Sequence, residues 1–441
     1  MKIVHLLGWY FPDSVGGTEV YVEGLCRRLG AAGHEVLVAA PDSHQAAPER
    51  YEHDGVRVFR YPIADTPTRD EANQRVPVRG ADRLHRWLAE ERPDILHVHS
   101  FTSGVGLAEI REARRLGMRV IVTCHLPSLA YMCRTGELMQ WGRTACDGIA
   151  IPDKCAACAL TRLGMPQAAA ELAGAIPPAL GAALGRIPGR IGTTLGMTAS
   201  IRDLQTRQAE LFGMVERFVV LNDTARRMLI ANGSPGQKIA LNRLGVGPSD
   251  VAPKPAAELQ PTARPVRFLY LGRLFPQKGV IALVRAAIAV ARDVPFHLDV
   301  RGPQIDAASR AYSAEVRLLA AADPRLTIAG GVAGDEVSAL LKSYDVLLCP
   351  SLSFENGPTI ALEAMAVGTP VIGSRVGNLI ELIDDGVTGR LVDPGNVPAW
   401  SDALRRTATD PATTIDRWRR ALPPVRTMDD VARDYLTLYA A

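Results

Sequence analysis

The chain has 441 residues, of which 47% are hydrophobic and 22% charged, and its formal net charge is +3. This length exceeds the size at which one hydrophobic core stops growing, so we expect two domains. The small net charge, without basic stretches interleaved with aromatic residues, argues against nucleic acid as a partner. No uncharged apolar run reaches the roughly 18 residues of a membrane span. The opening MKIVHLLGWYFP lacks the long apolar core of a signal peptide, so we expect a globular protein of the reducing cytoplasm.

In the first 125 residues, apolar runs of strand length alternate with segments of helical periodicity. The expected strands are Lys2–Leu7, Val36–Ala40, Val56–Tyr61, Ile95–His99 and Val120–Thr123, with helices near 18–32, 82–91 and 106–116. This alternation predicts a parallel sheet covered by helices on both faces.

Ligands of such sheets bind beyond the carboxyl ends of the strands. Gly16, Gly17, His99 and His125 all fall at that edge. For the glycine pair the alternative is a tight turn. For the histidines, one of His97 and His99 is expected to be a hydrogen-bonded core residue.

From about residue 126 to 212 the alternation stops, and the chain becomes rich in Ala, Gly, Pro and Arg. The part from Leu172 to Arg190 is apolar, built of small residues and interrupted by prolines. Three interpretations remain open for this insertion: a mobile lid, an acceptor-binding helical pair, and an interfacial membrane contact.

Four cysteines of the insertion, Cys133, Cys146, Cys155 and Cys158, follow the pattern C-x12-C-x8-C-x2-C. Four thiolates suit tetrahedral zinc, and glycines at 136, 142 and 148 would help a short loop to bend around an ion. Such a centre would be structural, because four protein ligands leave no open position for catalysis. An iron–sulfur cluster, two disulfides and unpaired thiols are the alternatives.

The second half begins after a proline-rich segment, residues 248–265, which is typical of a linker. A second alternating series then predicts strands at Val266–Leu271, Phe296–Val300, Leu326–Ile328, Val346–Cys349, Pro370–Gly373 and Gly389–Val392. We therefore expect domains at 1–250 and 265–425, with a final amphipathic helix, 427–441, that packs back on the first domain.

The stretch SLSFENGPTIALEAMAVGTPVIGS carries two carboxylates seven residues apart, Glu355 and Glu363. Glu355 is expected in the loop that leaves a strand, and Glu363 about one turn into the following helix. Between them lie Gly357, Pro358 and Thr359, where the unpaired backbone N–H groups of a helix start form an anion site.

A basic pair follows the first strand of the second domain, at Gly272–Arg273 and Lys278–Gly279. An arginine fork and a lysine point charge suit a diphosphate without requiring a metal. Two solvated surface cations are the alternative interpretation.

In this order, the motifs resemble the GT-B glycosyltransferases, specifically the large retaining family 4. The family's E-x7-E motif corresponds to Glu355 and Glu363, its basic pair to Arg273 and Lys278, and its glycine pair to Gly16–Gly17 within YFPDSVGGTEVYVEGLCRRLGAAGHEV. The resemblance covers nearly the whole chain except the insertion. It implies two Rossmann-like α/β domains with parallel sheets facing across a cleft.

The resemblance also implies the reaction and the roles. A hexosyl group would pass, with retention, from a nucleotide-diphosphate sugar to a hydroxyl of a glycan or lipid-linked acceptor, in cell-surface polysaccharide biosynthesis. Arg273 and Lys278 would hold the diphosphate and stabilise the leaving group. Glu363 would bind the ribose and Glu355 the transferred sugar, and no metal would be required for catalysis.

In the first domain, the resemblance implies that the backbone of Gly17 approaches the donor and that His125 lines the sugar pocket. One departure from the family is Gly357–Pro358–Thr359, which replaces an aromatic–Gly–Leu sequence. A sugar-nucleotide epimerase and a catalytically silent nucleotide-sugar-binding subunit are the rival functions. Peripheral contact with the inner face of the membrane is a further expectation.

Overall fold

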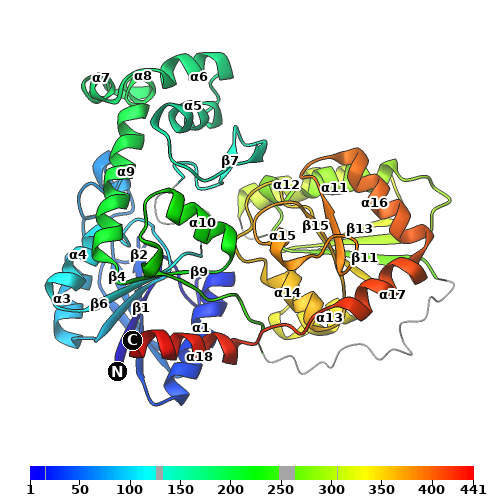
Figure 1. The fold of residues 1–441 in the computed structure, drawn as a ribbon, viewed down its shortest axis with the longest axis horizontal. Coiled ribbons are helices and arrows are strands. Elements are labelled where there is room, and N and C mark those ends of the chain that lie inside the picture. Colours follow the sequence, from blue (N-terminus) through cyan, green and yellow to red (C-terminus); the bar gives the residue numbers. More distant parts are fainter. Residues whose placement is uncertain (15, 126–132, 248–263, 305) are drawn as a thin grey trace. The chain divides into compact units, whose positions relative to one another are not determined.

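The computed structural model describes residues 1–14, 16–125, 133–247, 264–304 and 306–441. These residues form two compact units (Figure 1). Unit 1 comprises residues 1–142, 146–243 and 428–441, and unit 2 comprises residues 244–427 with the tripeptide 143–145. Most of the expected linker, residues 248–263, lies outside the described residues.

Unit 1 is built on an eight-stranded sheet with the order β10-β9-β6-β5-β1-β2-β4-β3. Its strands are β1 (Lys2–Leu6), β2 (Glu35–Asp42), β3 (Glu49–His53), β4 (Val56–Pro62), β5 (Ile95–Val98), β6 (Arg119–Thr123), β9 (Arg217–Val220) and β10 (Ile239–Leu241). All neighbours pair in parallel except β3, which pairs with β4 in antiparallel fashion. The prediction of a purely parallel sheet was therefore wrong at this edge, because the polar sequence ERYEH has no apolar run to indicate a strand.

The helices of unit 1 outside the insertion are α1 (Gly17–Ala31), α2 (Arg69–Ala72), α3 (Asp82–Glu91), α4 (Leu107–Arg115), α10 (Asp223–Ala231) and α18 (Met428–Ala440). The chain ends on this unit, where α18 lies beside α1 (Figure 1). The hydroxyl of Tyr21 donates to that of Tyr435 at 3.1 Å, and Arg28 pairs with Asp429. These contacts place the aromatic residues of α18 over the middle of the sheet.

The insertion folds into five helices and a short hairpin rather than a helical pair. The helices are α5 (Pro152–Arg162), α6 (Gln167–Gly174), α7 (Pro178–Leu184), α8 (Gly189–Leu195) and α9 (Met197–Met214), and the hairpin pairs β7 (Met139–Gln140) with β8 (Thr144–Ala145). The long α9 connects them to the sheet, and Arg111 on α4 forms two hydrogen bonds of 2.7 Å with Glu210 on α9. No helix in the described ranges is long and apolar enough to cross a bilayer.

Unit 2 contains a six-stranded, wholly parallel sheet with the order β13-β12-β11-β14-β15-β16. Its strands are β11 (Val266–Leu271), β12 (Phe296–Arg301), β13 (Leu326–Ala329), β14 (Val346–Cys349), β15 (Val371–Ser374) and β16 (Gly389–Val392). Its helices are α11 (Val280–Ala289), α12 (Ala307–Ala320), α13 (Val337–Ser343), α14 (Thr359–Ala366), α15 (Leu379–Leu382), α16 (Val397–Thr409) and α17 (Pro411–Ala421).

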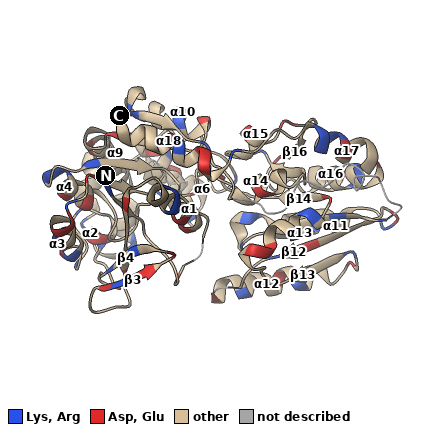
Figure 2. Cartoon of the chain, turned by 90° about the horizontal axis from the view of Figure 1, so that it is seen from below, with Lys and Arg blue, Asp and Glu red and all other residues tan. Residues whose placement is uncertain are grey.

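Each face of this sheet has its own hydrophobic core. Phe268 on β11 packs toward α11, α12, α16 and α17, whereas its neighbour Leu269 packs toward α13, α14 and α15. Successive residues of a strand point to opposite faces, so a strand buried on both faces reads as a continuous apolar run. Charged residues of both signs are interspersed along the helices of both units, with basic residues gathered on α17 (Figure 2).

In both sheets the strand order reverses at one point. In unit 1 the strand β1 lies between β2 and β5, and in unit 2 the strand β11 lies between β12 and β14. The connections leave such a point in opposite directions, which opens a crevice beyond the carboxyl ends of the strands. The expected site residues of each unit follow these central strands.

Candidate functional site

The loops that follow β11 and β14 bring the most strongly linked polar residues of unit 2 together. Lys278, in the short 3-10 turn before α11, lies 2.5 Å from Glu355, measured from Nζ to Oε1. The hydroxyl of Ser351 donates to the same carboxylate oxygen. The basic pair and the E-x7-E motif thus meet through Lys278 and Glu355, which are far apart in the sequence.

Two glycines pack closely against the backbone of the loop between β14 and α14. Gly377 has a φ of +52°, and a Cβ at this position would lie 2.2 Å from the carbonyl oxygen of Glu355. Gly279 has a φ of +70°, and its Cβ would lie 2.0 Å from the carbonyl oxygen of Pro350. The amide of Asn378 also donates to the carbonyl of Glu355 at 2.6 Å. The loop between β14 and α14 is therefore clamped by backbone contacts that only glycine permits.

Glu363 lies in the second turn of α14 and is half-buried. Its side chain makes no hydrogen bond or ion pair with any residue in the described part of the chain. Burial raises the pKa of its carboxyl group above the ordinary value. Its oxygens are therefore available to accept hydrogen bonds from a ligand's hydroxyl groups.

Arg273 follows β11 and extends into solvent, with its guanidinium carbon 5.3 Å from the centre of the Phe275 ring. The structure does not pair it with Glu355 or Glu363. Its backbone is fixed instead, because the hydroxyl of Tyr270 donates to its carbonyl at 2.8 Å. Next to it, the carbonyl of Gly272 lies only 2.2 Å from the position of a Cβ at Gly302, which keeps the ends of β11 and β12 close.

The start of α14 is uncapped. Pro358 is the N-cap residue, and no side chain caps the helix. The amide of Thr359 turns back to the carbonyl of Gly357 at 3.0 Å, and the amide of Ile360 has no acceptor among the described residues. The positive end of this helix remains open to an anion.

In unit 1, a chain of three imidazoles crosses the carboxyl edge of the sheet. Nδ1 of His5 lies 2.8 Å from Nε2 of His99, and Nδ1 of His99 lies 3.1 Å from Nε2 of His125. His97 is the core histidine, since its two nitrogens contact the hydroxyls of Tyr439 at 2.6 Å and Thr123 at 2.7 Å. The ring of His125 packs edge-on against Tyr21 at 4.7 Å.

These histidines are neutral at pH 7. Burial lowers the pKa of His5 and of His125 to about 3, and the pKa values of His97 and His99 fall well below 6.5 through burial and neighbouring histidines. Nε2 of His5 is buried without a partner. We assign it as the unprotonated nitrogen, because an N–H buried without an acceptor is the costlier arrangement. The protons then lie on each Nδ1, and Nδ1–H of His125 ends the chain as a donor.

The glycine pair starts α1, with Gly16 as the N-cap and Gly17 as the first helical residue. Neither has a positive φ. A Cβ at Gly16 would lie 2.7 Å from Oε2 of Glu19, whereas a Cβ at Gly17 would meet nothing within 4 Å. The packing of the chain itself therefore leaves the space at Gly17 open.

The four cysteines of the insertion are free thiols that line one cavity of about 30 Å³. Burial, with a smaller contribution from the nearby Cys146 and Cys133, raises the pKa of Cys155 to about 11. The structure thus brings together the four cysteines that the sequence pattern grouped.

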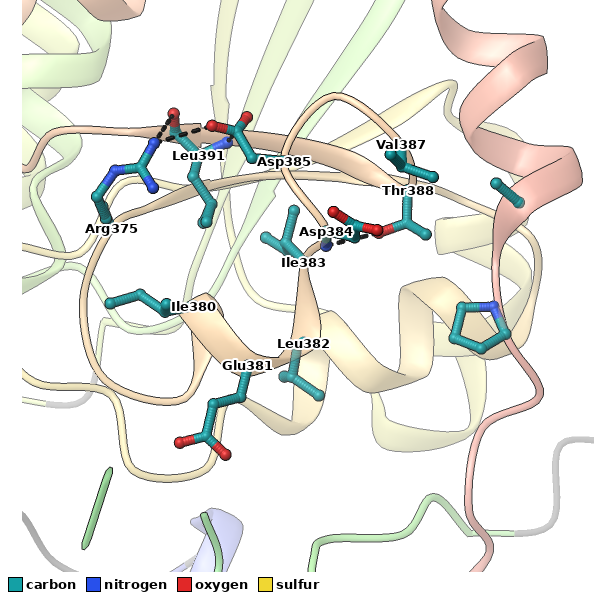
Figure 3. Close-up of a pocket in the computed structure, with 12 residues that line it drawn as sticks. Arg375, Ile380, Glu381, Leu382, Ile383, Asp384, Asp385, Val387, Thr388 and Leu391 are labelled. Atoms are coloured by element: carbon teal, nitrogen blue, oxygen red, sulfur yellow. Dashed lines mark hydrogen bonds and ion pairs between the residues drawn. The ribbon is translucent and has the colours of Figure 1, made fainter. Parts of the chain in front are cut away.

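The largest cavity described in unit 2, of about 660 Å³, lies elsewhere (Figure 3). It is lined by α15, the loop before β16 and the end of α17, and it includes none of the motif residues. Arg375 is bonded to Asp385 at 2.9 Å, and Thr388 accepts the amide of Asp384 at 2.9 Å. These polar groups lining the cavity are therefore hydrogen-bonded to one another.

Sequence reasoning missed three contributors to these arrangements: Ser351, Gly377 and His5. Ser351 and Gly377 each lie within three residues of the end of a strand, a position that could have indicated a role at the edge of the sheet. His5 lies inside β1, and nothing in its neighbourhood in the sequence distinguishes it from a core residue.

Two family models match the chain one after the other. The model described as Glycosyltransferase Family 4 matches residues 15–172, and that described as Glycosyl transferases group 1 matches residues 265–410. The chain belongs to the GT-B glycosyltransferases of family 4. The second model spans the whole Lys278–Glu355–Glu363 arrangement, so this region is shared with the family.

Curated relatives extend over most of the chain. A D-inositol 3-phosphate glycosyltransferase of Arthrobacter sp. is 27% identical over 92% of this chain and 85% of its own length. A glycogen synthase of Mycobacterium tuberculosis is 25% identical over 96% of this chain and 89% of its own length. The name of the first relative is that of a glycosyltransferase, in agreement with the family.

Solved structures share the fold. Sucrose-phosphate synthase from Thermosynechococcus elongatus superposes with a TM-score of 0.69 at 19% identity, covering 100% of this chain and 98% of that one. Anabaena Alr3699/HepE, solved with UDP and glucose, gives a TM-score of 0.64 at 14% identity over the whole of both chains. The predicted GT-B class, with two parallel-sheet α/β domains, is confirmed.

The clamp at Gly377 predicts a large difference between two glycine-to-alanine substitutions. Gly386→Ala meets no neighbour within 4 Å and costs only its left-handed backbone, about 1–2 kcal/mol. Gly377→Ala has the same backbone cost and also forces its Cβ against the Glu355 carbonyl. We expect it to lower the free energy of unfolding by about 2 kcal/mol more than Gly386→Ala, measured by urea unfolding. Equal losses in the two variants would contradict the clamp.

The neutral histidines predict that stability falls in mild acid. Between about pH 3 and 6.5 the unfolded chain binds more protons than the folded chain, because each histidine regains its ordinary pKa on unfolding. The free energy of unfolding should therefore decrease as pH drops below about 6.5, by up to about 1.4 kcal/mol per pH unit for each buried histidine.

Urea unfolding at pH 7.5, 6.5 and 5.5 measures this dependence. His5→Leu should flatten the slope by about one histidine's share, and substitution of the exposed His44 by Gln should leave the slope unchanged. Stability that is independent of pH over this range would show that these histidines have the same pKa in the folded and unfolded chain, and would contradict the prediction.

Proposed function

We propose that this glycosyltransferase transfers a hexosyl group, with retention, from a nucleoside-diphosphate sugar to a hydroxyl group of a glycan or glycolipid. The observation that carries the proposal is the pairing of Lys278 with Glu355 beside the uncapped start of α14. The site thus offers a cation, an open helix terminus and carboxylates within one loop system. Alr3699/HepE, which shares the fold, was solved with UDP-glucose as well as with UDP, which supports a nucleotide-sugar donor.

The chemistry matches this set of groups. Breaking the bond between the sugar C1 and the phosphate oxygen places negative charge on the leaving diphosphate. Lys278, Arg273 and the free amide of Ile360 stabilise that charge as it develops. The acceptor oxygen forms the new bond to C1 on the same face, and its proton passes to the leaving diphosphate. No metal ion is required for this charge balance.

The carboxylates serve as hydroxyl acceptors. Glu363, which has no partner within the described chain, accepts from the ribose hydroxyls of the donor. Glu355 uses Oε1 for Lys278 and Ser351, and its Oε2 makes no hydrogen bond in the described structure, so that oxygen receives a hydroxyl of the transferred sugar. A carboxylate neutralised by a lysine is a poor nucleophile, which argues against a covalent glycosyl–enzyme intermediate on Glu355.

Unit 1 contributes the neutral groups. Its His125 presents Nδ1–H as a donor to a sugar hydroxyl, and the chain through His99 and His5 fixes that tautomer. The open space at Gly17 admits a ligand to the first amides of α1. Both features suit an uncharged sugar.

For the acceptor, we propose a lipid-linked molecule at an anionic membrane surface. The helices α6 to α8 and their connections expose large apolar side chains, with Leu172 at 77%, Ile191 at 65% and Leu180 at 52% of full exposure. Arg186 and Arg190 flank the exposed Ile187, and only Glu171 opposes them between residues 163 and 196. Apolar side chains bordered by arginines suit the boundary of headgroups and acyl chains.

A binding experiment tests the donor site. A thermal-shift screen of nucleoside diphosphates and their sugars identifies the donor, and calorimetry measures its dissociation constant. Lys278→Ala should weaken donor binding about 10- to 100-fold, the share of one charge-assisted contact to the diphosphate. Lys342→Ala, a lysine of α13 in the same unit, should leave the constant unchanged.

An activity assay distinguishes the glycosyltransferase from the two rival functions. The same proteins are incubated with labelled donor, with and without lipid extract. Product that requires the extract supports transfer, conversion of donor alone supports an epimerase, and binding without any product supports a silent subunit. Unaltered donor binding by Lys278→Ala would reject the role of the lysine.

Vesicle co-sedimentation tests the membrane contact. The double variant Ile187→Ser/Ile191→Ser should bind vesicles of phosphatidylcholine and phosphatidylglycerol at least about tenfold more weakly, because it removes two exposed isoleucines from the bilayer boundary. Leu318→Ser/Val387→Ser, which alters exposed apolar residues of unit 2, is the matched control. Equal binding by wild type and Ile187→Ser/Ile191→Ser would exclude this surface.

A further inference from the structure

Four of the seven cysteines lie in the insertion of unit 1, and glycosyl transfer makes no use of them. The other three, Cys26, Cys124 and Cys349, are buried separately in the two domain cores. Cys133, Cys146, Cys155 and Cys158 instead line the same cavity of about 30 Å³. We propose that these four cysteines bind one Zn²⁺ ion as a structural centre of the insertion.

The backbone presents the four sulfurs from two turns and one helix. In the first turn, the amide of Gly136 donates to the carbonyl of Cys133 at 3.2 Å, and Gly136 has a φ of +71°. In the second turn, Gly148 has a φ of +74° and follows Cys146 by two residues. The β7–β8 hairpin joins the turns, and the amide of Cys146 reaches back to the carbonyl of Leu138 at 3.0 Å. Both loops are therefore bent around the cavity.

The remaining two ligands come from the first turns of α5. Cys155 and Cys158 are three residues apart on this helix, so their side chains project from the same face. Pro152 starts the helix at its first position, which fixes the chain just before the first ligand. A C-x2-C pair at a helix start, opposite two glycine turns, is a four-ligand arrangement suited to a tetrahedral ion.

Each sulfur also has a hydrogen-bonding neighbour. Backbone amides point at three of them: Trp141 to Cys158 at 3.3 Å, Gly148 to Cys146 at 3.5 Å and Ile151 to Cys155 at 3.3 Å. The hydroxyl of Thr135 lies 3.2 Å from the sulfur of Cys133. A neutral thiol is a weak acceptor, whereas a thiolate is the form that binds metal and gains from amide donors. These donors would stabilise the cysteines in the thiolate form.

The insertion needs such a centre because its own core is small. The buried cluster beneath α5, α6 and α9 consists of Ala156, Ala157, Ala159, Leu160, Ala170, Met197 and Ile201. Four of these seven residues are alanines, so the apolar area that stabilises the fold is limited. Small domains with such cores are commonly held by metal sites or disulfides.

The cavity has room for a single ion. A volume of about 30 Å³ is enough for one water-sized ligand. Among the described residues, two groups of three possible metal ligands have donor atoms that all lie within 4.8 Å of one another: His5/His97/His99 and Glu23/His53/Asp54. As a set, the four cysteine sulfurs are farther apart than this. On binding zinc they must move to about 3.8 Å from one another, the separation in a tetrahedral site with bonds of about 2.3 Å.

The two other groups are weaker candidates. The nitrogens of His97 are both engaged by Tyr439 and Thr123, and His5 and His99 are bonded to each other. The second triad is a surface group in which Asp54 is already paired with Arg27 at 2.9 Å. The cysteines alone combine four ligands, a cavity and donors directed at the ligand atoms.

Metal analysis of the purified full chain tests the proposal. Plasma mass spectrometry should give about one zinc per chain. The double variant Cys155→Ser/Cys158→Ser should lose the zinc, whereas Cys349→Ala, which alters a buried cysteine of unit 2, should keep it. Replacement by Co²⁺ should give the intense visible bands of a tetrahedral tetrathiolate site.

A second measurement keeps the proposal testable if the double variant does not fold. Removal of metal from the wild type with a strong chelator should expose the insertion to limited proteolysis between residues 133 and 214, and added Zn²⁺ should restore its protection. A metal-free preparation with four titratable thiols in the insertion, two disulfides found by mass spectrometry, or iron with acid-labile sulfide would each overturn the zinc centre. These outcomes are independent of whether the chain transfers sugar.

Discussion

The ion pair between Lys278 and Glu355 organises the candidate site of unit 2. It joins the loops that follow β11 and β14, two strands that are adjacent in the sheet but far apart in the sequence. The backbone of Glu355 lies against Gly377 on one side of this loop, and Gly279 lies against Pro350 on the other. A lysine held in this way is placed before any ligand arrives, and preorganised charge is what stabilises a leaving diphosphate at low cost.

The two units use the same topology for different electrostatics. Each sheet reverses its strand order beside a central strand, and each places its functional side chains beyond that point. In unit 2 the crevice carries a lysine, an arginine and two carboxylates. In unit 1 it carries imidazoles, and the aromatic residues of α18 help to bury them, so their pKa values fall and they remain uncharged. Neutral donors for a sugar and fixed charges for a diphosphate are the two kinds of recognition that glycosyl transfer requires.

The insertion follows a different structural principle from the two sheets. Its helices are short, several begin at prolines, and their core consists largely of alanine. Such a segment cannot obtain from hydrophobic burial the stability that the sheets obtain from their two cores. The four cysteines line one cavity of this insertion. Elsewhere in the insertion, several leucines and isoleucines of α6 to α8 and their connections are exposed.

The sequence by itself determined the class of fold and most of the strands, because strands buried on both faces are continuous apolar runs; Val266–Leu271 and Val346–Cys349 were predicted to the residue. It did not predict the polar edge strand β3, whose sequence ERYEH has no apolar run. The motifs indicated Lys278, Glu355 and the four cysteines, but not that Lys278 contacts Glu355, that Gly377 holds the loop, or that His5 completes a chain to His125. Those facts depend on which strands become neighbours, and strand order is set by the packing of the whole sheet rather than by any local run of residues.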